Sequence, residues 1–178
     1  RIMKKVILIT GGQRSGKSLT AERMALSLSP TPVYMATAHA WDEEFKHRIA
    51  RHQERRGPCW TNIEEEKTLS KHLLYNKVVV VDCITLWCTN FFYDASNDSS
   101  STLPDVDKTL EELKAEFDKL TAQEATFIFV TNEIGSGGVS NNALQRRFTD
   151  LQGWMNQYVA AKADEVYLMV SGIAVKIK

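Results

Sequence analysis

Short apolar runs alternate along this chain with longer segments in which apolar residues recur every three or four positions. The runs are rich in β-branched and aromatic residues and almost continuously apolar, which is typical of strands covered on both faces. They predict strands at 4–10, 32–36, 78–82, 126–131, 165–170 and 173–177. The segments between them predict helices at 17–28, 42–55, 66–75, 105–121 and 141–161.

This alternation predicts an α/β fold with a doubly wound, mainly parallel sheet. The last two strands, joined by Ser171-Gly172, are expected to form an antiparallel hairpin. The polar segment 94–104 has the composition of a mobile loop, which could also cover a ligand. A chain of 178 residues that is 43% hydrophobic can bury one core, so residues 1–178 are expected to form a single domain.

Charge and cysteine content exclude several classes of protein. The 22 basic and 22 acidic residues balance, so no general attraction to nucleic acid or to an anionic membrane is expected. No apolar segment reaches a membrane-spanning length. The three cysteines, Cys59, Cys83 and Cys88, lack C-x-x-C spacing, which indicates neither a disulfide framework nor a zinc site. A cytoplasmic location suits this composition.

A phosphate-binding motif follows the first predicted strand. Residues 11–18 fit G-x-x-x-x-G-K-[ST], between the run 6–9 and a helical pattern, as a P-loop requires. Its backbone N–H groups and helix N-terminus would surround a polyphosphate, Lys17 would supply a charge, and Ser18 would offer a hydroxyl to Mg²⁺. The motif therefore predicts a P-loop NTPase-like fold and a nucleotide ligand, bound by Gly11, Gly12, Gln13, Arg14, Ser15, Gly16, Lys17 and Ser18.

Three further segments could carry chemistry. Asp82 ends the apolar strand 78–82, where a second P-loop motif would place an acid that holds Mg²⁺; a helix cap is the structural alternative. Arg48, His52 and Arg56 recur every four residues, so one helix face would place an imidazole between two guanidiniums. That face could bind phosphate, with His52 as a nucleophile, or it could be an ordinary solvated surface.

The segment after residue 131 leaves a strand through a glycine-rich loop at the edge where ligands bind in such sheets. Asn132 and Glu133 are candidate site residues, and the alternative is a connection in which Ser140 or Asn141 caps the next helix. Three charged residues farther along fit surface pairs equally well: Arg146, Arg147 and Asp150. The other histidines are interpreted as ordinary surface or loop residues: His39, His47 and His72.

Taken together, these segments resemble the bifunctional adenosylcobinamide kinase/adenosylcobinamide-phosphate guanylyltransferase family of cobalamin assembly. The resemblance runs from end to end of the chain. It is carried by GGQRSGKS at 11–18, YMATA at 34–38, RIARHQERRGPCW at 48–60, VVVVDCITLW at 78–87, TNEIGSGG at 131–138, RRFTDLQGWMNQ at 146–157 and ADEVYLMVSGIAVKIK at 163–178.

The resemblance implies a role for each motif. His52 occupies the position of the family histidine that carries GMP as a covalent phosphoramidate. Lys17 and Ser18 would bind triphosphate and Mg²⁺, Asp82 would be the second acidic position, and Glu64 would contact guanosine. ATP or GTP would be the substrates, together with adenosylcobinamide and its phosphate, and the enzyme would be a homotrimer.

Three questions stay open at this level. A P-loop kinase without guanylyltransferase activity would use the same loop, with His52 acting only electrostatically. A nucleotide-binding module would also use residues 11–18, although 131–133 do not match the N-K-x-D guanine motif of switch GTPases. Five aromatic residues could contact a corrinoid but fit the core better: Trp41, Phe45, Trp87, Phe91 and Phe92.

Overall fold

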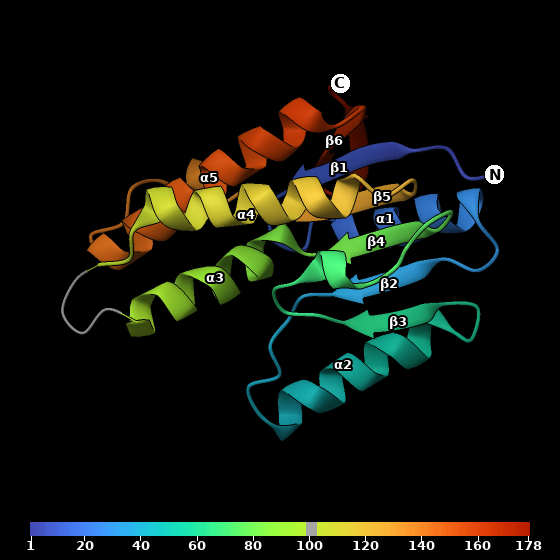
Figure 1. Ribbon diagram of the computed structural model, residues 1–178, viewed down its shortest axis with the longest axis horizontal. Helices are drawn as coiled ribbons and strands as arrows, with labels where there is room; N and C mark the ends of the chain where they lie inside the picture. The colour runs from blue at the N-terminus through green and yellow to red at the C-terminus, as the bar shows by residue number, and fades with distance from the viewer. Residues whose placement is uncertain (99–102) are drawn as a thin grey trace.

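A seven-stranded sheet organises the molecule, with the strand order β3-β2-β4-β5-β1-β6-β7 (Figure 1). The computed structural model describes residues 1–98 and 103–178. All neighbouring strands run parallel except β6 and β7, which form the expected C-terminal hairpin. The strands are β1 Lys5–Gly11, β2 Val33–Ala36, β3 Thr61–Glu64, β4 Val78–Asp82, β5 Thr126–Asn132, β6 Glu165–Val170 and β7 Ile173–Lys176.

Helices cover both faces of this sheet (Figure 1). One face carries α1, the opposite face carries α3, α4 and α5, and α2 lies along the edge strand β3. The helices are α1 Lys17–Leu28, α2 Glu43–Arg56, α3 Ile84–Asp98, α4 Val106–Thr121 and α5 Ala143–Lys162. Within the described ranges, no helix has the length and apolar character that crossing a membrane requires.

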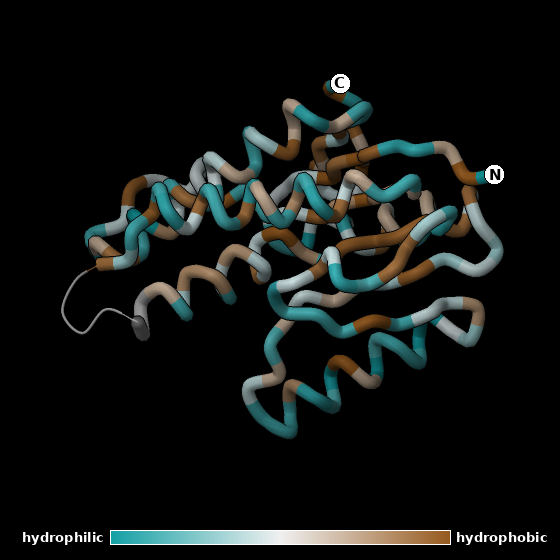
Figure 2. The backbone as a smooth tube through the Cα atoms, viewed as in Figure 1, coloured by the Kyte–Doolittle hydropathy of each residue, from teal (hydrophilic) through white to brown (hydrophobic). Residues whose placement is uncertain are grey.

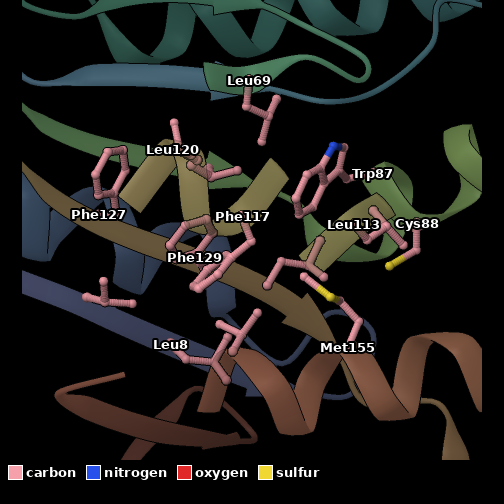
Figure 3. Close-up of a cluster of buried hydrophobic side chains, with 14 of the residues drawn as sticks. Leu8, Leu69, Trp87, Cys88, Leu113, Phe117, Leu120, Phe127, Phe129 and Met155 are labelled. Atoms are coloured by element: carbon pink, nitrogen blue, oxygen red, sulfur yellow. The ribbon is translucent and has the colours of Figure 1, made fainter. Parts of the chain in front are cut away.

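Alternating side chains of the central strands supply two apolar cores. Leu8 and Phe129 point toward α3, α4 and α5, where they join Phe117 and Trp87 in the larger core (Figure 3). Their strand neighbours, such as Ile9, point to the other face and pack against Ala21 and Ala25 of α1. Figure 2 shows the result, with apolar central strands and a largely polar α2. This two-sided burial explains why the strands read as continuous apolar runs.

The fold class and all six predicted strands are confirmed, each strand within one residue of its expected bounds. The sequence reasoning missed β3. This strand has four residues at the sheet edge, and its burial pattern is exposed, exposed, intermediate, exposed. A strand with so little apolar surface leaves no periodic signal in the sequence.

The predicted helix at 66–75 is wrong, because only a 3₁₀ turn forms there, Leu69–Lys71. Side-chain carboxylates accept hydrogen bonds from backbone N–H groups that would donate to backbone carbonyl oxygens in a helix. The Glu65 carboxylate accepts hydrogen bonds from the backbone of Lys67 and Thr68 at 3.2 Å each. Glu116 accepts one from Ser70 at 2.7 Å, and tertiary contacts therefore replace the i to i−4 pattern.

The interpretation of 94–104 as a mobile loop is corrected in part. Residues 94–98 belong to α3, a helix that the sequence reasoning did not predict. Residues 99–102 of the predicted loop lie outside the described residues. The signal for α3 was present in Ile84, Trp87 and Cys88, which are fully buried at helical spacing.

Candidate functional site

The P-loop connects β1 to α1 at the sheet edge where the parallel strands end. Two of its glycines are required by geometry. A Cβ at Gly11 would lie 2.8 Å from the Ser15 Oγ and 2.9 Å from the Met169 carbonyl oxygen. Gly16 caps α1 with φ of 96°, a left-handed conformation that side chains disfavour. The loop therefore curls tightly and directs the N-terminus of α1 toward the space above it.

Lys17 and Ser18 begin α1 and are held by neighbouring groups. Lys17 is 7% exposed, and its Nζ donates to the Gly12 carbonyl oxygen at 2.5 Å. Burial lowers the pKa of Lys17, an effect that the charge of Asp82 opposes. The Ser18 Oγ donates to the Asp82 Oδ2 at 2.7 Å, which joins the P-loop to the end of β4.

The pair Ser18 and Asp82 fits the chemistry of Mg²⁺. A hydroxyl oxygen and a carboxylate oxygen are the hard ligands that this ion prefers. The described residues contain no group of three or more His, Cys, Asp or Glu side chains arranged for a metal. A pair of oxygen donors suits an ion that takes few protein ligands and completes its shell with substrate phosphates and water.

Tyr34 in β2 links Asp82 to α2. Its hydroxyl donates to the Asp82 Oδ2, and the Arg56 guanidinium lies 3.6 Å from the centre of its ring. Burial and the neighbouring Asp82 raise the pKa of Tyr34, so the hydroxyl remains a proton donor. Burial also lowers the pKa of Arg56, whose Nη2 donates to the Asn62 Oδ1 at 2.8 Å.

One face of α2 borders the same cavity as the P-loop. The cavity holds about 590 Å³, and its lining includes residues 13–18, Asp82, Arg48, His52 and Arg56. The stripe predicted from four-residue spacing therefore faces the P-loop within a single chain. The same cavity is therefore lined by one imidazole and two guanidiniums from α2 together with the Lys17 ammonium and the Asp82 carboxylate.

The attachment of α2 to the rest of the chain is light. Among the residues that the structure describes, none in this helix is buried. Arg55 pairs with Glu22 of α1 at 3.3 Å, and Arg56 makes the contacts with Tyr34 and Asn62. All of these contacts lie in the last turn. The helix has its own support from the Asp42 cap, which accepts from the Phe45 N–H at 2.7 Å.

Comparison with known proteins assigns the chain to a family. The sequence model of CobU, described as cobinamide kinase / cobinamide phosphate guanyltransferase, matches residues 7–177. The chain belongs to this family. It is 37% identical to the bifunctional adenosylcobalamin biosynthesis protein CobU of Escherichia coli, over 97% of this chain and 99% of that protein. It is 36% identical to the CobP protein of Pseudomonas aeruginosa, over 96% of each chain.

Two solved structures share the overall fold of this member of the CobU family. A type III secretion ATPase from pathogenic bacteria aligns with a TM-score of 0.58 at 11% identity, over 98% of this chain and 57% of that one. The flagellar accessory protein FlaH of Methanocaldococcus jannaschii aligns with a TM-score of 0.50 at 15% identity, over 99% of this chain and 79% of that one. At these identities the likeness shows the fold alone.

The cavity of this CobU-family chain includes some predicted residues and leaves others out. Asn132 lines it, whereas Glu64 lies exposed on β3 and is not among its lining residues. The Glu133 carboxylate accepts hydrogen bonds from the Ser136 side chain and from the backbone of Ser136 and Gly135, and these hydrogen bonds lower its pKa. Glu133 therefore shapes the loop that follows β5.

Other candidates lie elsewhere. Arg146, Arg147 and Asp150 line a separate cavity of about 880 Å³ beside α4 and α5. The cap of α5 is Asn142, whose side chain accepts from Leu144 and Gln145, and neither Ser140 nor Asn141 takes that position.

The sequence reasoning missed Tyr34 as a residue of the site. A tyrosine inside an otherwise apolar strand was the available signal, within the segment YMATA. Two of the five aromatic residues considered for corrinoid contact are core residues, Trp87 and Phe92. Trp41 is 61% exposed.

Proposed function

We propose that this chain phosphorylates adenosylcobinamide with ATP or GTP and then transfers GMP from GTP to the product. The second reaction gives adenosylcobinamide-GDP and pyrophosphate. The observation that carries the proposal is the single cavity shared by Lys17, Asp82 and His52. The bifunctional names of the relatives and the CobU family match support the same pair of reactions.

In the first reaction, the hydroxyl of the aminopropanol arm attacks the γ-phosphorus of the triphosphate, and the nucleoside diphosphate leaves. The backbone N–H groups of residues 12–18 and the Nζ of Lys17 hold the phosphate oxygens as charge develops on them. Ser18 and Asp82 would hold Mg²⁺, which neutralises charge on the phosphate oxygens when bound. The Tyr34 hydroxyl keeps the Asp82 carboxylate in place.

In the second reaction, a neutral imidazole nitrogen of His52 attacks the α-phosphorus of GTP and expels pyrophosphate. A phosphate oxygen of adenosylcobinamide phosphate then attacks the same phosphorus, the bond to His52 breaks, and the imidazole is regenerated. Covalent catalysis divides one difficult displacement into two easier ones. Arg48 and Arg56, on the same face of α2, would bind the phosphate oxygens during both steps.

We also propose the remaining features that the family resemblance implies. Glu64 would contact guanosine from the end of β3, and three copies of the chain would form the enzyme. An α2 helix that buries none of its described residues leaves an outer face available to another copy. The free thiols Cys59, Cys83 and Cys88 suit the reducing cytoplasm.

Covalent labelling tests the guanylyltransferase assignment. The protein is incubated with Mg²⁺ and GTP labelled at the α-phosphate, denatured, and tested for the stability of the label in acid and base. We expect an acid-labile, base-stable label on the wild type that is absent from His52→Ala. His47→Ala is the matched control, because His47 lies on the same helix and does not line the cavity.

Each other outcome has a definite meaning. A folded wild type that binds GTP and takes no label would reject guanylyl transfer and leave a kinase or a nucleotide-binding protein. A label that persists in His52→Ala would assign the nucleophile to another residue. Corrinoid phosphorylation that survives in His52→Ala would separate the two reactions within the one cavity.

A further inference from the structure

A second, smaller cavity lies beside the nucleotide cavity and has an aromatic wall. It holds about 310 Å³, and His39, Trp41 and Tyr93 form the aromatic platform on one side. The ring centres of His39 and Trp41 are 4.6 Å apart, and those of Trp41 and Tyr93 are 5.6 Å apart. Polar side chains border the same space: Glu66, Lys67 and Asp94.

The aromatic platform is unusual because its rings face solvent. Trp41 is 61% exposed and Tyr93 is 52% exposed, whereas Trp87 and Phe92 of the neighbouring helix turns are core residues. Large aromatic rings gathered on a surface are characteristic of a binding site, since single exposed rings need no explanation but contiguous apolar patches do. The adjoining carboxylates and ammonium group make the patch suitable for a ligand with both apolar and amide groups.

Hydrogen bonds hold the platform in position. The Asn90 Nδ2 donates to the carbonyl oxygens of Thr37 and Glu66, at 2.7 and 2.8 Å. The Lys67 Nζ pairs with the Asp94 Oδ2 at 2.6 Å. Glu66 also binds the Nδ1 of His39, which fixes the ring on which Trp41 packs. The site is therefore organised before any ligand arrives.

The two cavities adjoin along two segments of the chain. In the β2–α2 connection, Ala38 and Phe45 line the nucleotide cavity, while His39 and Trp41 between them line the second. In α3, Leu86 lines the nucleotide cavity and Tyr93 the second. Seven helical residues span about 10 Å along the axis. A ligand of moderate size can therefore reach both cavities at once.

We propose that the aromatic platform is a subsite for the corrin body of the acceptor, a step that rests on the proposed function. The reacting hydroxyl of that acceptor ends a short flexible arm, and the other end of the arm carries a broad ring with apolar edges and amide groups. With the arm in the nucleotide cavity, the ring edge packs on Trp41 and Tyr93. Glu66, Lys67 and Asp94 then pair with the amides.

Steady-state kinetics with Trp41→Ala and Tyr93→Ala test this assignment. We expect the KM for adenosylcobinamide to rise about tenfold in each variant, the size expected when an aromatic contact is lost. The KM for the triphosphate and the covalent GMP label formed without corrinoid should stay unchanged. Trp41→Phe should recover most of the affinity, because it restores a ring at this position.

Trp154→Ala is the matched control, since Trp154 is 45% exposed and lines the separate cavity beside α5. An unchanged corrinoid KM in both platform variants of an active enzyme would overturn the inference alone. The inference would also be overturned if a platform variant formed a smaller oligomer than the wild type while its KM for the corrinoid stayed unchanged. That result would show that the aromatic platform is a contact between copies of the chain. A wild type without corrinoid turnover would reject the proposed function and this inference with it.

Discussion

The two walls of the nucleotide cavity are built in different ways. The P-loop wall is mostly backbone, follows directly from β1, and keeps Lys17 at 7% exposure. The α2 wall consists of side chains on a helix in which no described residue is buried. The P-loop wall is therefore fixed by the sheet, whereas the α2 wall depends on a few contacts in its last turn.

This difference matches the chemical roles that we propose. A phosphate cradle works best when its N–H groups are fixed before the ligand arrives, because no reorganisation is then needed. A histidine that must accept GMP and release it again needs access to two different partners. A lightly attached helix provides that access, at the cost of a position that single substitutions can disturb.

The largest effect should come from the P-loop wall. Lys17→Ala removes the cation that would stabilise the phosphate oxygens in both reactions. We expect both phosphorylation of adenosylcobinamide and covalent guanylylation to fall by about 100- to 1,000-fold. Lys46→Ala is the control, because the Lys46 side chain is exposed on α2 and pairs with Glu43 in the same helix. Loss of one activity alone would show that the two reactions do not share the loop.

A smaller and selective effect should come from the α2 wall. Arg56→Ala removes the contacts with Tyr34 and Asn62 that hold the end of the helix. Guanylylation should fall about tenfold, the loss expected for one charge-assisted contact, and phosphorylation should fall less. Labelling rates and kinase rates are measured side by side, with Arg51→Ala as control since Arg51 does not line the cavity. Equal losses in both reactions would contradict the division between the walls.

Tyr34→Phe tests the link between the two walls. The ring that packs under Arg56 stays, while the hydroxyl that donates to Asp82 is lost. We expect the free energy of unfolding to fall by about 1–2 kcal/mol, because the half-buried Asp82 carboxylate loses one hydrogen-bond donor. The Mg²⁺ concentration needed for half-maximal kinase activity should rise a few-fold. A denaturant titration and a Mg²⁺ titration measure the two effects. If both titrations matched those of the wild type, the role of Tyr34 in the site would be rejected.

The smallest effect on catalysis should come from Glu65, which does not line the nucleotide cavity. Burial opposes its ionisation, but Lys71, His72 and two backbone N–H groups lower the pKa of Glu65 to about 2. Because the folded pKa lies below the ordinary value of 4.5, the stabilisation is complete above that pH. It is lost as the pH falls toward 2.

Glu65→Gln should therefore destabilise the fold at neutral pH by at most about 3 kcal/mol. The difference from the wild type should shrink as the pH drops from 4.5 toward 2, while both activities at neutral pH stay within twofold. Denaturant unfolding across this pH range measures the first effect. A constant difference down to pH 2 would show that the carboxylate charge is not what stabilises the segment.

Local patterns in the sequence predicted much of the fold and part of the site. The continuous apolar runs identified the buried strands, and the motif at 11–18 predicted the P-loop because its glycine spacing and neighbouring elements are local properties. The four-residue spacing of Arg48, His52 and Arg56 correctly placed them on one helix face. Edge strand β3 and the turn at 69–71 were missed because tertiary contacts, and not periodicity, determine them.

The sequence alone therefore determined six of the seven strands, the phosphate loop and, through its resemblance, the family. Only the tertiary structure decided that His52 lines the same cavity as the P-loop within one chain, and that solvent-facing rings gather beside that cavity. It also decided that the Tyr34 hydroxyl donates a hydrogen bond to Asp82 while the Tyr34 ring packs against Arg56. The physical reason is the range of the interactions involved. Backbone geometry and periodic burial act between neighbours in the chain, whereas these contacts join residues that only the parallel order of the strands brings to one edge.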